Sequence, residues 1–220
     1  MSSSTPLSTL VHVSKAADAI DCASKILTGG SCFSDQIRNK LINHLFTGCV
    51  NPFGTIFNPL SIARVMEMAI ERVEITVDDV RHNDGRYFHY DFHSTFAATE
   101  PMEVAKHINA ALLDTHKFIK RADYFILTFG TSIAYRLMAE DRIVSNCHKM
   151  PNHTFEKTLL SVAQMEEKLY GLVEKIRMVN PSVKLICTVS PVRHTKEGII
   201  ENNRSKSRLI ELCHRLVEGV

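Results

Sequence analysis

The chain has 220 residues, enough for one large domain or two small ones with a substantial core. Apolar residues make up 45% and charged residues 23%, and the net charge of +2 excludes the strong basic excess typical of nucleic-acid-binding proteins. No apolar run is long enough to span a bilayer, and the first residues lack the basic start and apolar segment of a secretory signal. We therefore expect neither nucleic acid nor membrane as a partner.

The six cysteines are scattered and form no Cys-x-x-Cys pair, so a structural zinc site is not expected. Several of them lie among apolar residues, which suits free thiols in a reducing compartment and predicts a cytoplasmic protein. Residues 1–24 are expected to be a flexible or irregular lead-in, and residues 25–220 a single domain. The sequence leaves the oligomeric state open, with an oligomer as one option.

The first predicted element is a short buried strand over residues 25–27, which runs into Gly29-Gly30-Ser31. Two glycines relax the backbone where a strand must turn sharply into a helix. A serine at this turn lies at the carboxyl end of the strand, beside outward-pointing helix amides, where it can be a nucleophile or an N-cap. Apolar residues spaced four apart predict the helix itself over residues 34–46.

Residues 51–59 contain two Asn-Pro pairs and a glycine, which predicts an ordered loop. Asn58 followed by Pro59 is a typical helix start, and apolar spacing predicts a helix to about residue 73. Residues 75–99 look irregular. If residues 88–94 are extended, the polar side chains of His89, Asp91 and His93 share one face. Helical spacing returns over residues 103–120.

Residues 124–129 form the clearest predicted strand, apolar on both faces as in the middle of a parallel sheet. A polar stretch around residues 146–151 follows. A helix over 159–178, a strand over 183–189 and a helix over 206–217 complete the chain. This alternation predicts an α/β fold built of βαβ units around a mainly parallel sheet.

Ligands of such sheets bind beyond the carboxyl ends of the strands. Here those ends are predicted at residues 30–31, 51–54, 130–132 and 190–194, all rich in glycine, hydroxyl or amide groups. We therefore expect these four segments to form one site.

Several polar residues admit a functional and a structural interpretation, and for each the structural one is preferred. His89, Asp91 and His93 can be metal ligands, a His–Asp pair or a hydrogen-bond cluster. Cys32 can be a reactive thiol at a helix start or a core residue. The same choice concerns the loop residues near the predicted site: Asn146 and His148 (substrate contact or loop fixation), Arg193 (anion binding or a solvated side chain) and His194 (proton acceptor or structural histidine).

Seven short motifs occur together and in order, and they closely resemble the GSCFA family. They are Gly30-Ser31-Cys32-Phe33, Asn51-Pro52-Phe53-Gly54, Asn58-Pro59-Leu60-Ser61-Ile62-Ala63, Asp91-Phe92-His93-Ser94, Gly130-Thr131, Asn146-Cys147-His148-Lys149 and Ser190-Pro191-Val192-Arg193-His194. In the first motif Ser34 replaces the alanine of the family's name. The resemblance covers about residues 26–209.

That family is grouped with SGNH-type hydrolases. The resemblance therefore implies a three-layer, flavodoxin-like α/β fold that cleaves or transfers acyl esters, often on carbohydrates. It implies Ser31 as the nucleophile and the amides of Cys32 and Gly54 as oxyanion donors. Gly130-Thr131-Ser132 lies where the SGNH group has a Gly-x-Asn-Asp block; the asparagine is absent, and the Ser132 hydroxyl is the candidate replacement. No metal or organic cofactor is required.

The resemblance departs from the family at the C-terminus, because Val220 is reached before any Asp-x-x-His motif. Three explanations are open. The chain is a truncated form, or its catalytic base comes from elsewhere, with His194 as the candidate, or the protein does not catalyse. The predicted function is a serine esterase or acyl-transferase acting on a carbohydrate or small ester. The alternative is a non-catalytic binding module on an SGNH-like fold.

Overall fold

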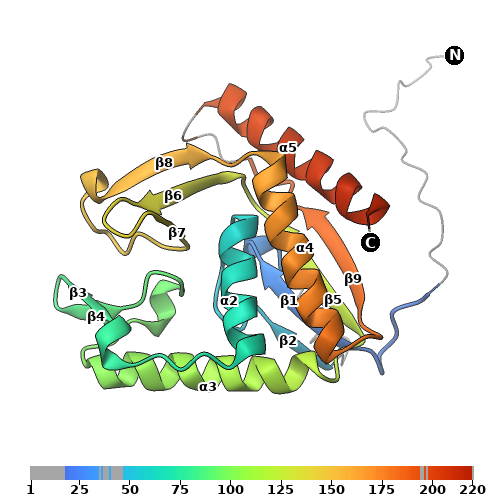
Figure 1. The fold of residues 1–220 in the computed structure, drawn as a ribbon, viewed down its shortest axis with the longest axis horizontal. Coiled ribbons are helices and arrows are strands. Elements are labelled where there is room, and N and C mark those ends of the chain that lie inside the picture. The colour runs from blue at the N-terminus through green and yellow to red at the C-terminus, as the bar shows by residue number, and fades with distance from the viewer. Residues whose placement is uncertain are drawn as a thin grey trace, which may run out of the picture.

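The computed structural model describes residues 18–34, 36, 40, 47–193, 196 and 198–219. At its centre lies a parallel sheet with the strand order β2–β1–β5–β9 (Figure 1). The four strands are β1 (Lys25–Gly30), β2 (Thr47–Val50), β5 (Tyr124–Phe129) and β9 (Lys184–Val189). This order is that of flavodoxin-like sheets, in which the direction of winding switches between the first strand and its neighbour, here β1 and β5. The predicted α/β fold with a parallel sheet is confirmed.

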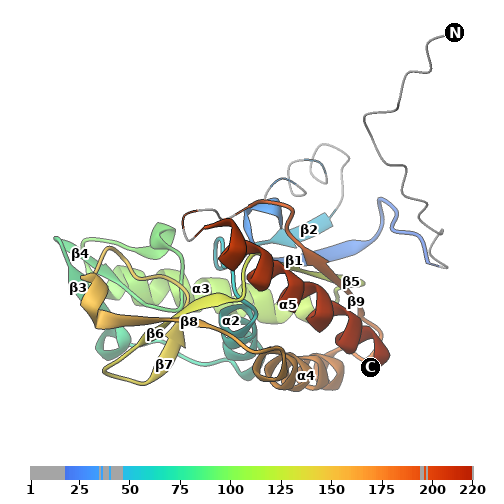
Figure 2. The ribbon, with the colours of Figure 1, turned by 90° about the horizontal axis from the view of Figure 1, so that it is seen from above.

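Helices flank this sheet (Figures 1 and 2). Helices α2 (Pro59–Glu71) and α4 (Val162–Val179) pack side by side, α3 (Pro101–Ile119) packs against α2, and α5 (Ile199–Glu218) packs against α4 and β9. Their apolar side chains join those of β1 and β5 in one large core cluster. Burial of this area is the main favourable term in the stability of the fold.

Local signals account for the helix starts. Asn58 Oδ1 accepts a hydrogen bond from the Ser61 amide at 2.9 Å, and Pro59 occupies the first turn, as the sequence predicts. Ser161 and Gln164 form a reciprocal capping box at the start of α4. Most of the helix predicted over residues 34–46 lies outside the described residues.

A second, antiparallel sheet with the order β7–β6–β8 is not predicted from the sequence. Its strands are β6 (Ile133–Leu137), β7 (Arg142–Val144) and β8 (Phe155–Leu159). A two-stranded hairpin of β3 (Arg81–Asn83) and β4 (Arg86–Phe88) lies within the segment predicted to be irregular. These strands have three to five residues each, too few for a periodic pattern to identify them.

Two further predictions need correction. Residues 88–94 are not one extended strand with a polar and an apolar face: β4 ends at Phe88, and all residues from Phe88 to Phe92 are buried. Helix α5 begins at Ile199, well before the predicted residue 206. In the described part of the chain, no helix is long and apolar enough to cross a membrane.

One buried carboxylate connects the loop after β4 to the antiparallel sheet and to α2. The Asp91 side chain is 2% exposed; its Oδ1 accepts a hydrogen bond from Arg142 Nη1 of β7 at 2.8 Å, and its Oδ2 lies 3.6 Å from Arg64 Nε of α2. A buried carboxylate is tolerated only when paired in this way. Asp91 therefore fixes the loop after β4 against β7 and α2.

We expect Asp91→Asn to lower the free energy of unfolding by about 2 kcal/mol, because both guanidinium groups lose their buried partner. The control is Asp114→Asn, which removes an ion pair with Lys117 whose two side chains are 62% and 76% exposed, and should cost less than about 0.5 kcal/mol. Urea unfolding measures both. Equal effects of the two substitutions would contradict the structural role of Asp91.

Candidate functional site

The carboxyl ends of β1 and β2 are joined by two hydrogen bonds to Gly30. The Gly30 amide donates to Asn51 Oδ1 at 2.9 Å, and the Gly30 carbonyl accepts from the Ile56 amide at 2.9 Å. The loop after β2 is therefore fixed directly to the residue before Ser31. Asn51 has φ +43°, in the left-handed region that asparagine adopts more readily than most residues. Asn51 is predicted in this loop from the sequence, but its positioning role is not.

Gly30 also approaches β5 very closely. It has φ +141°, and a Cβ atom there would lie 2.1 Å from the Thr128 carbonyl oxygen. The next amide, that of Ser31, donates to the same Thr128 oxygen at 3.0 Å. Only glycine permits this junction, which places Ser31 between the ends of β1 and β5, at the switch point of the sheet.

The hydroxyl group of Ser31 is enclosed and lacks a hydrogen-bond partner among the described residues. The residue is 0% exposed and lies against Gly130, where a Cβ atom would be 3.2 Å from that of Ser31. The Ser31 carbonyl accepts from the Ser34 amide at 2.8 Å, as at the start of a helix. A buried hydroxyl without a partner costs about 1–3 kcal/mol, and such groups are rare in folded proteins.

The two predicted oxyanion amides differ. Cys32 begins a helical segment, where amides of the first turn have no acceptor within the helix. Its side chain is exposed, contrary to the expectation that it points into the core. The Gly54 amide instead donates to the Asn51 carbonyl at 2.8 Å and closes the turn after β2.

Residues 130–132 bind neighbouring segments rather than facing open space. The amides of Gly130 and Thr131 donate to the Phe57 carbonyl at 2.8 and 3.1 Å. The hydroxyls of Thr131 and Ser132 both contact Ser205 of α5, through its Oγ at 2.9 Å and its carbonyl oxygen at 3.3 Å. The Ser132 hydroxyl, the candidate replacement for the missing asparagine, is thus already engaged.

The end of β9 joins the same edge through Lys206 of α5. Its ammonium donates to the carbonyl oxygens of Gly130 at 2.5 Å and Ser190 at 2.7 Å. All four predicted strand-end segments therefore meet along one edge of the sheet. Arg193 is exposed, and His194 lies outside the described residues.

Asn146 and His148 connect the loop after β7 to the loop after β4. Asn146 Oδ1 accepts from the His148 amide at 2.9 Å, while His148 Nε2 lies 3.1 Å from the carbonyl oxygens of both His89 and Phe92 and donates to them. The imidazole stacks on Phe88 with centroids 4.3 Å apart. Burial lowers the pKa of His148 to about 4, so the ring is neutral and carries its proton on Nε2.

The other two histidines bond their own loops. His89 Nδ1 accepts from the Asp91 amide at 3.1 Å, and His93 Nδ1 from the Thr95 amide at 3.3 Å. His93 also packs against Gly54, where a Cβ atom would be 2.3 Å from its own. No group of three or more His, Cys, Asp or Glu side chains in the described part of the chain is placed to hold a metal ion. Each histidine thus accepts a hydrogen bond from a backbone amide of its own loop.

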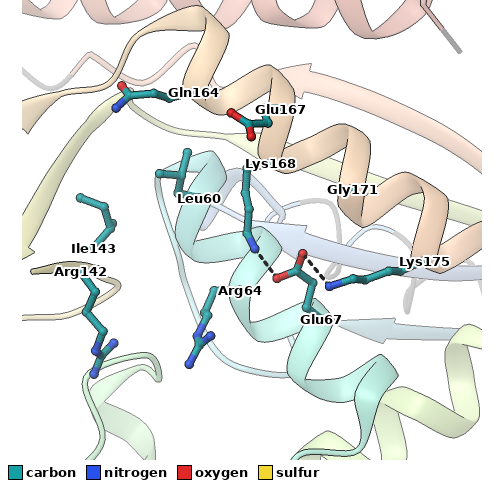
Figure 3. A pocket seen from close by; sticks show the side chains of 10 residues that line it. All are labelled: Leu60, Arg64, Glu67, Arg142, Ile143, Gln164, Glu167, Lys168, Gly171 and Lys175. Atoms are coloured by element: carbon teal, nitrogen blue, oxygen red, sulfur yellow. Dashed lines mark hydrogen bonds and ion pairs between the residues drawn. The ribbon is translucent and has the colours of Figure 1, made fainter. Parts of the chain in front are cut away.

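Open space lies elsewhere in the molecule. Beside Gly30 and Gly54 the cavity volume is only about 10 Å³. A cavity of about 580 Å³ lies between α2, α4 and β7, and Ser31 does not line it (Figure 3). There Lys168 and Lys175 reach from α4 to the buried Glu67 of α2.

Comparison with known proteins gives one match. The model of the GSCFA family matches residues 25–220. No curated protein and no solved structure matches the chain. The matched range contains the described parts of all four strand-end segments, so it covers the candidate site as well as the sheet.

We expect Gly54→Ala to destabilise the protein by about 3 kcal/mol: about 1 from the positive φ of +77° and about 2 from the contact with His93. The matched control is Gly85→Ala. Gly85 has a similar φ of +72°, but nothing lies within 4 Å of the added Cβ, so only the backbone term of about 1 kcal/mol applies. Chemical unfolding of both variants measures the difference. If the two costs are equal, the loops do not pack as described.

The low pKa of His148 predicts a pH-dependent stability. The unfolded chain takes up a proton near pH 6.5, whereas the folded protein does so only near pH 4. The contribution of His148 to the free energy of unfolding is therefore at its maximum above pH 6.5. It falls as the pH drops toward 4, by up to about 1.4 kcal/mol per pH unit. In His148→Gln, whose amide can still donate to both carbonyls, this part of the slope should disappear. Unfolding curves between pH 4 and 7 measure it; an unchanged slope would contradict the buried neutral imidazole.

Proposed function

This chain belongs to the GSCFA family, and we propose that it is a serine esterase or acyl-transferase acting on a carbohydrate or another small ester. One observation carries the proposal: the Ser31 hydroxyl, which has no hydrogen-bond partner in the described part of the chain, lies at the switch point of the sheet, where ligands of such folds bind. A protein that keeps a buried hydroxyl without a hydrogen bond forgoes stability, and active sites are where such costs are found.

In the proposed reaction Ser31 Oγ attacks the acyl carbon while a histidine takes up the hydroxyl proton. The carbonyl π electrons move onto the acyl oxygen, which the amides of Cys32 and Gly54 stabilise. Collapse of this intermediate breaks the ester C–O bond, and the leaving alcohol receives the proton. Water or an acceptor hydroxyl then releases the acyl group by the same steps. His194 is the proposed base, and Gly54 must exchange its bond to the Asn51 carbonyl for the acyl oxygen.

The proposal requires a conformational step. Because Ser31 is 0% exposed, the loops around it must open before an ester reaches the hydroxyl. We further propose that the protein works in the cytoplasm. The described cysteines with assigned side chains are free thiols, as expected in a reducing compartment: Cys22, Cys32, Cys147, Cys187 and Cys213.

The second candidate is a non-catalytic binding module. The observation that favours it is the contrast between the enclosed Ser31 and the cavity of about 580 Å³ on another face (Figure 3). This volume is within the range of small-molecule sites. Its lining mixes apolar side chains such as Leu60 with both signs of charge, which suits a polar ligand.

We expect Ser31→Ala to lower the rate of para-nitrophenyl acetate hydrolysis by at least about a thousandfold, because the nucleophile is lost. The same substitution should raise the free energy of unfolding by about 1 kcal/mol, because it removes an unsatisfied buried hydroxyl. Ser34→Ala is a matched control, since Ser34 is also 0% exposed and its hydroxyl also lacks a partner among the described residues. It should gain similar stability and keep its activity.

Equal activity of the two variants would contradict Ser31 as the nucleophile. An inactive wild-type protein that binds sugars or esters, measured by calorimetry, would instead support the binding module.

A further inference from the structure

Lys206 is a half-buried cation at the candidate site that the sequence analysis did not identify. It projects from α5, and its ammonium binds the carbonyl oxygens of Gly130 and Ser190 at the ends of β5 and β9. These two bonds use two of the three N–H groups of the ammonium. The third has no acceptor among the described residues.

The ammonium lies close to the proposed nucleophile. Gly130, whose carbonyl oxygen it binds, packs directly against Ser31. Burial lowers the pKa of Lys206, and an electrostatic interaction with the Cys32 thiol acts in the opposite direction. Lys206 therefore faces the junction of β5 with the Ser31–Cys32 turn.

Lys206 has no counterion within the described ranges of the chain. Two half-buried lysines on α4 provide a comparison. Lys168 and Lys175 both form ion pairs with Glu67. Among the described residues, no carboxylate pairs with Lys206, and its charge is balanced only by the two carbonyl dipoles. A partly buried charge without an opposite charge is costly, so such a group is suited to bind negative charge from a ligand.

No neighbouring hydroxyl of residues 130–132 is free to take this role. Thr131 and Ser132 both bind Ser205, the residue before Lys206 on α5. One turn of α5 thus does two things. Ser205 binds the hydroxyls of Thr131 and Ser132, and Lys206 brings its ammonium to the edge of the sheet.

We propose that Lys206 is a catalytic residue that donates its third N–H to the acyl oxygen of a substrate held at Ser31. This inference rests on the proposed function. As Ser31 Oγ attacks, the carbonyl π pair moves onto the acyl oxygen, and the ammonium binds the negative charge that develops there. When the intermediate collapses, the pair returns to re-form the carbonyl and the alcohol leaves with the proton from the histidine. Lys206 keeps all its protons throughout.

The experiment compares Lys206→Met, Lys206→Arg and Arg208→Met in the full chain, with para-nitrophenyl acetate as substrate. Arg208 is a matched control, because it lies on the same helix and also donates to two carbonyl oxygens, those of Leu159 and Leu160 at 2.9 and 2.6 Å. We expect Lys206→Met to lower kcat about a hundredfold with little change in KM. Arg208→Met should reduce stability but keep kcat.

Lys206→Arg provides a readout that a purely structural role would not change. In the wild type, kcat should fall at alkaline pH as Lys206 deprotonates below its usual pKa of 10.5. Arginine stays protonated to about pH 12, so this variant should retain part of the activity and shift the alkaline limb to higher pH.

Three outcomes would overturn the inference, and they are distinguishable. If Ser31→Ala abolishes activity but Lys206→Met retains it, the role of Lys206 is wrong and the proposed function stands. If Lys206→Met and Arg208→Met lose kcat equally and Lys206→Arg keeps the wild-type pH profile, Lys206 is structural. If the wild type shows no Ser31-dependent hydrolysis, the proposed function fails, and this inference fails with it.

Discussion

The close approach of Gly30 to the backbone of β5 is the constraint on which the candidate site depends. A Cβ atom at Gly30 would lie 2.1 Å from the Thr128 carbonyl oxygen, so no other residue fits without moving one of the two central strands. The same glycine bonds the loop after β2 through both its amide and its carbonyl group. Gly30 therefore fixes the positions of three segments relative to one another: the end of β1, the loop after β2, and β5. Ser31 is the next residue in the chain, so its position is fixed as well.

The hydrogen bonds at this edge explain which groups remain available for chemistry. Asn51, Thr131 and Ser132 use their polar side chains to connect loops and helix α5. Among the described residues, the Ser31 hydroxyl and the third N–H of Lys206 are groups near Gly130 that these bonds leave without a partner. Both border Gly130. Groups that the fold does not need for its own stability are the ones free to act on a ligand.

The sequence predicts β1, β5 and β9 of the central sheet because the signal of each is local, whereas no strand is predicted at β2. Five of the six residues of β5 are apolar or aromatic, and Asn58-Pro59 marks the start of α2 by its own chemistry. The short strands β6, β7 and β8 carry no comparable pattern, since each gains stability mainly from its neighbours. The faces expected for His89 and Asp91 were wrong for a related reason: tertiary packing buries all residues from Phe88 to Phe92.

The convergence of the four strand-end segments could also be predicted, because the carboxyl ends of parallel strands lie at one edge of a sheet. The roles of particular side chains could not. Asn51 gave a partial signal, since asparagine tolerates a left-handed backbone and the residue precedes proline in a loop. Lys206 gave none: a lysine within an amphipathic helix looks like a solvated residue until the helix is placed over the strand ends.

The charges around the edge follow from the same arrangement. The imidazole of His148 is kept neutral by burial, and its proton is committed to two carbonyl oxygens. The carboxylate of Asp91 is neutralised by its arginine partners away from Ser31. In the described part of this edge, Lys206 contributes a positive charge, and the amides that follow Ser31 contribute the positive ends of their dipoles. An edge built in this way favours a ligand that becomes negative at Ser31 over one that becomes positive, which is the polarity that acyl transfer to a serine requires.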